Sequence, residues 1–333
     1  MKNFNLILTT FVFSFHILIA ASSDPVFGEN GMIVSTSKQA SEAGIEILKK
    51  GGNAVDAAVA VGFALAVTSS SNGNIGGGGF MVAAMTDGET FTLDYREKAP
   101  AAAHRDLFLN ESGNVVPGMS LSSRAGSGIP GSVDGLIRAL ADHGSGNISL
   151  RQALAPAIRL AEKGFELSHY EARRFNGYEG LFQSNDAAAA IFIRKDNNPW
   201  IKGDKLVQKD LAKTFKRISK YGRDGFYTGP VADLIVAEMK RGNGLISLED
   251  LKNYSSVYRD PISGTYNGHE VISMGPPSSG GALLVNMMNM LENYPVDSLG
   301  WNSSDYIHLL TEIERRAYAD RAEHMGDSDF WDV

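Results

Sequence analysis

The chain has 333 residues, of which 43% are hydrophobic and 21% are charged, and this length and composition predict one large or two small globular domains. A net charge of −7 argues against nucleic acid or an anionic membrane surface as a partner. Because the sequence contains no cysteine, a disulfide framework and thiol catalysis by this chain are both excluded.

The first 22 residues have the layout of a secretory signal peptide. Lys2 supplies a positive start, an apolar core runs from Leu6 to Ile19, and small residues follow it. A membrane anchor is the alternative, but the core is short for a span of about 20 residues. We therefore predict a signal peptide over residues 1–22, a folded region over residues 23–333, and a periplasmic or secreted location without membrane contact after cleavage.

Two helices are predicted near the start of the folded region. In residues 37–52, apolar side chains recur on one helical face, and Gly51-Gly52 ends the helix. Asn53 then caps a second helix that continues to Thr68. This second helix is apolar nearly all round, which predicts a place in the core.

The segment from Ser69 to Pro100 has the most informative pattern. Four glycines, Gly76 to Gly79, precede an apolar run, an Asp-Gly pair and a second extended run that ends at Tyr95. An Asp-Gly pair between two β-prone runs is typical of a β-hairpin. Arg96 is therefore predicted at the end of a buried strand, at the rim of a sheet, where its guanidinium can face a ligand.

Two roles are open for the glycine run and two for Arg96. A phosphate loop needs Lys-Ser/Thr after its glycines, but Phe80 follows here, so we favour close backbone packing over phosphate binding. Arg96 can form an internal ion pair with an Asp or Glu, or it can bind a ligand carboxylate through both arms of its guanidinium. From the residues alone, the internal ion pair is the expected role.

Beyond the hairpin the pattern predicts mainly helices, and residues 171–205 receive no assignment. The predicted elements are a loop-rich stretch over residues 100–124, a helix after a glycine turn within 128–144, helical turns around Pro156, amphipathic helices within 211–222 and 230–244, a helix start capped by Ser247, paired strands within 258–274, and a Met-rich apolar helix within 276–293.

Other candidate functional residues are few. His308 and Glu312 lie one helical turn apart, but no third ligand is at a metal-site spacing. We therefore predict a solvated polar face or buried structural hydrogen bonds for this pair, and neither a metal nor a cofactor. Ser278-Ser279 has the composition of a nucleophile loop, but we favour a helix cap. No Gly-x-Ser-x-Gly elbow is present. The residues alone thus predict a secreted α/β protein without a recognisable nucleophile.

Several motifs, in order along the chain, resemble the large subunit of bacterial γ-glutamyltransferases, also called glutathione hydrolases. They include the segments GNIGGGGFMV, LDYREKAP, GIPGSVDGL, GLISLEDLKNY, PPSSGG and AYADRAEHMGDSDF. Together with the two opening helices, they extend over nearly everything after the predicted signal peptide. So many ordered motifs make the resemblance far more specific than one short pattern.

The resemblance implies an α/β (α+β) fold of the N-terminal-nucleophile (Ntn) hydrolase class, an αββα sandwich. Its large-subunit part has many helices and is incomplete without the small subunit. In that family the precursor cleaves itself, and the new N-terminal threonine of the small subunit attacks the γ-glutamyl carbonyl, with its own α-amine as the base. The γ-glutamyl group of glutathione or a related compound then passes to water, an amino acid or a peptide.

The family's nucleophile lies in a Thr-Thr-His motif, and the only Thr-Thr pair in this sequence is Thr9-Thr10, within the predicted signal peptide. We therefore expect no catalytic residue on this chain and expect a small subunit as its partner. The arginine of the family's D-x-R-E motif maps onto Arg96, so the resemblance implies that Arg96 binds the substrate α-carboxylate. The alternatives are a non-catalytic truncated product that binds γ-glutamyl compounds, or a chain like a poly-γ-glutamate depolymerase or a cephalosporin acylase.

Overall fold

The computed structural model describes residues 25–72 and 74–332. The chain divides after Ile33 into a short N-terminal unit and a larger unit, and every helix and strand below belongs to the larger unit. The predicted signal peptide lies outside the described residues. Within the described ranges, no helix has the length and apolar character needed to cross a bilayer.

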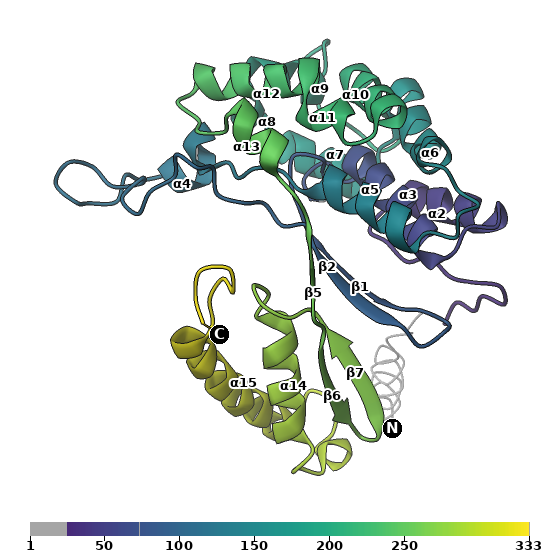
Figure 1. Ribbon diagram of the computed structural model, residues 1–333, viewed down its shortest axis with the longest axis vertical. Coiled ribbons are helices and arrows are strands. Elements are labelled where there is room, and N and C mark those ends of the chain that lie inside the picture. The colour runs from purple at the N-terminus through teal and green to yellow at the C-terminus, as the bar shows by residue number, and fades with distance from the viewer. Residues whose placement is uncertain (1–24, 73, 333) are drawn as a thin grey trace, which may run out of the picture. The chain divides into compact units, whose positions relative to one another are not determined.

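Figure 1 shows the elements with the labels used here. In chain order they are α2 (Lys38–Lys49), α3 (Ala54–Thr68), β1 (Phe80–Ala84), β2 (Thr90–Asp94), α4 (Met119–Ser122), the 3-10 turn η1 (Arg124–Gly126), α5 (Ser132–His143), α6 (Leu150–Lys163), β3 (Phe165–Glu166), α7 (His169–Gly177), α8 (Glu179–Gln183), α9 (Asp186–Phe192), β4 (Lys205–Leu206), α10 (Lys209–Tyr221), α11 (Asp224–Tyr227), α12 (Gly229–Arg241), α13 (Leu248–Asn253), β5 (Val257–Arg259), β6 (Ile262–Tyr266), β7 (His269–Ser273), α14 (Gly280–Leu291), the 3-10 turn η2 (Val296–Ser298) and α15 (Ser304–His324).

The predicted hairpin is confirmed as β1 and β2, which pair antiparallel with Phe80 opposite Asp94. Gly88 lies in the turn with φ +91°, a backbone conformation that glycine adopts without steric cost. On its other side β2 pairs antiparallel with β5, where Leu93 lies opposite Tyr258. The sheet therefore has the order β1-β2-β5, with the most buried strand in the middle.

Helices α3, α5, α6 and α10 pack on one another, and α5 contacts β2 (Figure 1). Buried side chains of these helices form one core cluster with Phe91 and Leu93 of β2. The predicted core helix is confirmed, because α3 buries eleven of its fifteen residues. Asn53 and Asp56 form a reciprocal cap at its start: the Asn53 side chain accepts the Asp56 amide, and the Asp56 carboxylate accepts the Asn53 amide. The predicted helix before Gly51-Gly52 is confirmed as α2, and the structure adds a Ser37 cap at its start.

Helix α6 is longer than the helical turns predicted around Pro156, since it runs without interruption from Leu150 to Lys163. A proline inside a helix removes one backbone hydrogen bond. Packing compensates for that loss, because helix stability in a protein comes mostly from burial of the apolar face. Four side chains of α6 are completely buried: Ala153, Leu154, Ala157 and Ala161.

Residues 171–205, which the sequence left unassigned, contain the rest of α7, the short helices α8 and α9, and β4. Ser168 caps α7 and Asn185 caps α9. Aromatic side chains from these helices and from the loop before β4 pack on one another: Phe175, Phe182, Phe192 and Trp200. Helices this short are stabilised mainly by side-chain contacts with other elements. They are also too short to show a clear apolar period, which explains why residues 171–205 received no assignment from the sequence alone.

The last part of the chain folds as the β6–β7 hairpin with α14 against it and α15 against α14. The helix predicted to start after Ser278-Ser279 is confirmed as α14, with Ser279 at the N-cap position and Ser278 Oγ accepting the Gly280 amide at 3.2 Å, but the Ser279 hydroxyl does not act as a cap. The Ser279 backbone is already helical, at φ −77° and ψ −13°, and its hydroxyl makes no cap bond. Instead, Ser279 Oγ accepts a hydrogen bond from Arg321 Nε of α15 at 3.0 Å.

Candidate functional site

Arg96 lies two residues beyond the end of β2, where its side chain is exposed. Its amide donates a hydrogen bond to Asp94 Oδ1 at 3.0 Å, and its carbonyl accepts one from the Tyr254 hydroxyl at 2.8 Å. The Arg96 Cζ atom is 5.8 Å from the centre of the Phe80 ring. The backbone of Arg96 is thus held on both sides while its guanidinium remains open to solvent, as predicted for a residue at the rim of a sheet.

Arg96 does not form the expected internal ion pair with any carboxylate of residues 25–72 and 74–332. At the end of β2, the carboxylate of Asp94 pairs with Arg259 instead. Arg259 Nε is 2.8 Å from Asp94 Oδ2, and its Nη2 is 2.9 Å from Asp329 Oδ2. Only 13% of the Arg259 side chain and 7% of the Asp94 side chain are exposed. The bonds to Asp329 and Asp94 raise the pKa of the Arg259 guanidinium, against the opposing effect of burial. Arg259 therefore joins β2 to the segment after α15.

The glycine run lies directly beneath Arg96. A Cβ atom on Gly78 would come within 2.4 Å of the Tyr95 carbonyl oxygen and 2.8 Å of the Arg96 Cα. The Gly79 amide donates to the Tyr95 carbonyl at 3.2 Å, and the Tyr95 amide donates back to Gly79 at 3.0 Å. Close backbone packing, the role favoured from the sequence, is confirmed.

The start of α5 also contacts the glycine run. Helix N-termini bind phosphates through their open amide groups. Here the amides of Gly131 and Ser132 donate to the Gly77 carbonyl at 2.8 and 3.0 Å, and the Ser132 hydroxyl donates to Asn74 at 3.0 Å. These groups are occupied within the protein, which argues further against a phosphate loop.

We expect Gly78→Ala to lower the free energy of unfolding by about 1–3 kcal/mol, because its methyl group would overlap backbone atoms that cannot move aside freely. The control is Gly180→Ala on α8, where no atom lies within 4 Å of an added Cβ. This control should be neutral or stabilising by up to about 1 kcal/mol. Urea unfolding of both variants measures the difference, and equal stabilities would contradict the close packing beneath Arg96.

Contacts from distant elements also hold the stretch that follows Arg96. The backbones of Lys98 and Ile129 exchange hydrogen bonds of 3.2 and 2.8 Å. The Ala101 amide donates to Asp250 Oδ1 at 2.9 Å, and Asp250 also completes the predicted cap with Ser247 at the start of α13. These bonds lower the pKa of the Asp250 carboxyl against the opposing effect of its burial. The whole D-x-R-E segment is therefore a rigid support for one exposed guanidinium.

The other candidate residues do not form a site. Glu312 pairs with Arg315 and Arg316 on the exposed face of α15, and His308 is exposed on the same helix. Among the described residues, no three potential metal ligands lie close enough together to hold a metal ion. The solvated polar face predicted for His308 and Glu312 is thus confirmed.

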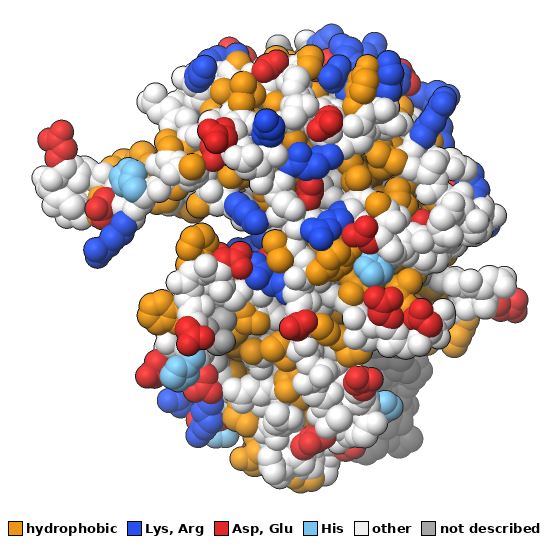
Figure 2. Space-filling view, in the orientation of Figure 1, with side chains coloured by type: hydrophobic (Ala, Val, Ile, Leu, Met, Phe, Trp, Pro, Cys, Tyr) orange, Lys and Arg blue, Asp and Glu red, His pale blue; other side chains and the backbone are white. Residues whose placement is uncertain are grey.

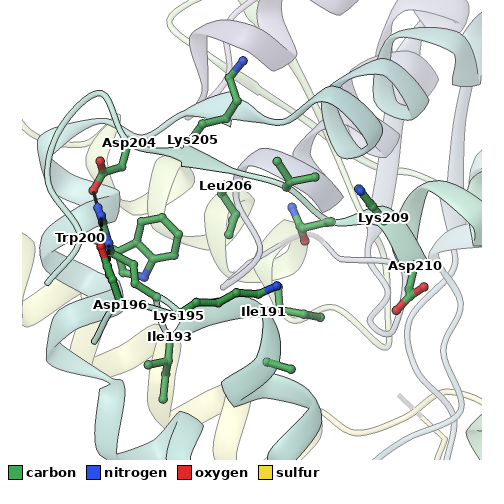
Figure 3. Close-up of a pocket in the computed structure, with 14 residues that line it drawn as sticks. Ile191, Ile193, Lys195, Asp196, Trp200, Asp204, Lys205, Leu206, Lys209 and Asp210 are labelled. Carbon is green, nitrogen blue, oxygen red and sulfur yellow. Dashed lines mark hydrogen bonds and ion pairs between the residues drawn. The ribbon is translucent and has the colours of Figure 1, made fainter. Parts of the chain in front are cut away.

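A cavity of about 760 Å³ lies away from Arg96, between the end of α9 and the start of α10. Figure 3 shows Trp200, Asp196 and Asp204 on one side of it, and Lys209 and Asp210 on the other. Arg194 pairs with Asp204 and, at 2.7 Å, with Asp196, and it lowers the pKa of the Asp196 carboxyl. Because the carboxylates of Asp196 and Asp204 already pair with Arg194 in the cavity wall, we do not assign a binding function to this cavity.

Lys and Arg side chains gather over α10 and α12, at the top of the view in Figure 2. Several of them pair with carboxylates: Lys213 with Asp210 at 2.8 Å, Arg241 with Glu238, and Lys216 with Glu162 at 2.5 Å. Exposed pairs of this kind contribute little to stability. The surface is therefore one of mixed charge rather than a continuous basic patch.

The residues that hold Arg96 were missed by sequence reasoning, although Asp94 and Tyr254 both lie in segments that resemble the family. Asp94 stands two positions before Arg96, and Tyr254 ends the GLISLEDLKNY segment. No periodicity or spacing in the sequence indicates that Tyr254 or Arg259 would reach β2, because these contacts join residues more than 150 positions apart.

Comparison with known proteins agrees with this picture. The family model for gamma-glutamyltranspeptidase matches residues 40–333. The chain is 46% identical over 312 residues to the glutathione hydrolase proenzyme of Pseudomonas sp. (strain A14), covering 93% of this chain and 54% of that protein. It is 45% identical over 306 residues to the glutathione hydrolase proenzyme of Escherichia coli (strain K12), covering 92% of this chain and 52% of that protein.

Among solved structures, the crystal structure of Helicobacter pylori gamma-glutamyltranspeptidase is similar, with a TM-score of 0.90 and 44% identity, covering 93% of this chain and 88% of that chain. This likeness confirms the fold class implied by the sequence motifs. The chain spans about half the length of the curated relatives it matches. A match of this extent and identity shows that the chain belongs to the gamma-glutamyltranspeptidase family.

Proposed function

We propose that this chain is the large-subunit portion of a γ-glutamyltransferase that acts as a glutathione hydrolase. It cleaves the γ-glutamyl bond of glutathione or a related compound and transfers the γ-glutamyl group to water, an amino acid or a peptide. The similar proteins of Pseudomonas and Escherichia coli are named glutathione hydrolase proenzymes, which supports this substrate class. Residues 1–22 act as the signal peptide, residues 23–333 form the large-subunit region, and the enzyme works in the periplasm or outside the cell.

The proposal includes a small-subunit partner. The chain covers 88% of the matched Helicobacter pylori chain but only 54% of the Pseudomonas proenzyme, as expected if a precursor of the longer length is cleaved into two parts. The partner's N-terminal threonine supplies the nucleophile, and its α-amine takes the hydroxyl proton during attack. The same proton passes to the nitrogen of the γ-glutamyl amide bond as that bond breaks, and the donor's amine leaves. The γ-glutamyl-enzyme ester then breaks when water or an acceptor amine attacks the same carbonyl.

The observation that supports this function most directly is the state of Arg96. Its guanidinium is exposed and, within the described part of the chain, is not bound to a carboxylate, while its amide and its carbonyl are both hydrogen-bonded to other side chains. A guanidinium presented in this way can pair through two parallel hydrogen bonds with the α-carboxylate of a γ-glutamyl group. Arg96 is therefore the substrate-binding residue that we assign to this chain.

The test uses the assembled enzyme, meaning this chain produced in one precursor with the small-subunit portion of a similar glutathione hydrolase. We expect it to release p-nitroaniline from γ-glutamyl-p-nitroanilide, and faster when a dipeptide acceptor is added. The 333-residue chain alone should give no turnover above an inactivated control. Turnover by the chain alone would place a nucleophile on it, and a processed but inactive assembly that still binds glutamate would favour the non-catalytic alternative.

A further inference from the structure

Tyr254 follows the last residue of α13 and donates its hydroxyl proton to the Arg96 carbonyl at 2.8 Å. Only 3% of the Tyr254 surface is exposed. Burial raises the pKa of its phenol, so the hydroxyl stays protonated and remains a donor at neutral pH. This is the contact through which the second half of the chain reaches the backbone of the substrate-binding arginine.

The space around this hydroxyl is closely filled. A Cβ atom on Gly131 would lie 2.1 Å from the Tyr254 hydroxyl oxygen and 2.1 Å from the Tyr95 carbonyl oxygen. The phenol therefore lies in contact with the backbone at residue 131 on one side and the Tyr95–Arg96 backbone on the other. Because protein interiors are closely packed and transmit strain, a shift of the Tyr254 phenol would also shift the Arg96 backbone.

The Tyr254 ring is held from behind. It stacks on the Tyr227 ring, with centroids 5.7 Å apart and an interplanar angle of 3°. The Tyr254 carbonyl accepts a hydrogen bond from the Arg223 guanidinium, whose Nε is 2.7 Å from Asp134 Oδ1. The other Asp134 oxygen accepts the Ser256 amide at 2.8 Å. A buried carboxylate and an aromatic stack thus fix the phenol before any ligand is present.

We propose that Tyr254 is a positioning residue for substrate binding, which sets the direction of the Arg96 side chain through the hydrogen bond to the Arg96 carbonyl. This inference rests on the proposed function, in which Arg96 binds the α-carboxylate of the γ-glutamyl donor. Asp94 holds the amide of Arg96 and Tyr254 holds its carbonyl, so the two bonds together fix the peptide planes on either side of the Cα atom. A bidentate pair between a guanidinium and a carboxylate requires a fixed direction of the arginine side chain, since a small misplacement of the guanidinium weakens the pair strongly.

Tyr227 provides a matched control. It is also a buried tyrosine, its ring belongs to the same stack, and its hydroxyl donates to a backbone carbonyl, that of Pro130, at 2.8 Å. The two hydroxyls differ in their partner, because only Tyr254 reaches Arg96. Tyr254→Phe removes one buried hydrogen bond and keeps the ring stack. Tyr227→Phe also keeps the stack but removes two, because the Tyr227 hydroxyl accepts the Asp134 amide at 3.3 Å as well, so the control should lose at least as much stability.

The experiment measures KM and kcat for γ-glutamyl-p-nitroanilide with the assembled enzyme. We expect Tyr254→Phe to raise KM about two- to tenfold, the range for one lost hydrogen bond, with kcat within about twofold of the parent value. Tyr227→Phe should leave KM within about twofold. In an Arg96→Ala background, Tyr254→Phe should have no further effect on KM, because the group that it positions is gone.

Amide hydrogen exchange of the assembled enzyme provides a second measurement that does not depend on turnover. Exchange in residues 95–98 should be faster in Tyr254→Phe than in the parent or in Tyr227→Phe. An unchanged KM in Tyr254→Phe, or an equal rise in both tyrosine variants, would overturn the positioning role while leaving the proposed function intact. If Arg96→Ala itself does not change KM, the assignment of Arg96 fails, and the inference about Tyr254 fails with it.

Discussion

Arg96→Ala should raise the KM of the assembled enzyme for γ-glutamyl donors about tenfold or more. A charge-assisted hydrogen bond contributes about 1.5–3 kcal/mol. Arg96→Ala removes both hydrogen bonds of the bidentate pair with the substrate carboxylate, so the loss of binding free energy should be at least that large. Arg96→Lys should restore only part of the loss, because an ammonium group cannot reproduce the planar fork of a guanidinium. Steady-state kinetics of the three proteins with γ-glutamyl-p-nitroanilide measures the effect.

Precursor cleavage should survive both changes, since no glutamate is bound in that step. Arg151→Ala serves as the control, because Arg151 is an exposed arginine on α6, outside the contacts that surround Arg96. Its KM should equal that of the parent enzyme. A purely structural role for Arg96 predicts the reverse pattern, in which Arg96→Ala lowers stability and impairs maturation while the KM of the surviving enzyme stays unchanged.

Arg259→Met should lower the free energy of unfolding by about 3–5 kcal/mol. The substitution leaves Asp94, a carboxylate with 7% of its side chain exposed, without its guanidinium partner. Removing one member of a buried ion pair is costly because the remaining charge is neither solvated nor compensated. Urea unfolding of parent and variant proteins measures the change, and limited proteolysis should show earlier cleavage near Asp329, which loses its partner as well.

Two further variants test the explanation. Asp94→Asn combined with Arg259→Met should recover part of the lost stability, since the uncompensated charge is then absent. Arg315→Met should cost less than about 0.5 kcal/mol, because Arg315 is 71% exposed and its pair with Glu312 lies on the surface of α15. A loss below about 1 kcal/mol for Arg259→Met would mean that the pair with Asp94 is not effectively buried.

Local patterns were enough to predict much of the fold. The Asp87-Gly88 pair between β-prone runs predicts the β1–β2 hairpin, and the all-round apolar sequence of residues 54–68 predicts the core helix α3. Ser247 followed by Asp250 predicts the start of α13. These predictions succeed because turn geometry, helix capping and apolar periodicity depend on residues within a few positions of one another.

Local patterns failed where a contact from elsewhere in the fold decides the structure. Ser279 has the composition of a helix cap, yet its hydroxyl bonds to Arg321 on α15. Residues 171–205 give weak periodicity, yet they contain short helices whose aromatic rings pack on one another, Phe192 of α9 against Phe175 of α7 and Phe182 of α8. In both places the deciding partner is supplied by another element, which a local pattern does not contain.

The sequence by itself determined the class of fold, the hairpin, the position of Arg96 at a strand end and, through its motifs, the family. Only the tertiary structure decided what Arg96 is free to do. Arg259, 165 positions from Asp94 in the sequence, forms the ion pair that the sequence suggested for Arg96, and Tyr254, 158 positions away, holds the Arg96 carbonyl. The physical reason is that a guanidinium is as well suited to an internal carboxylate as to a ligand, so its role depends on which carboxylates the folded chain brings within reach.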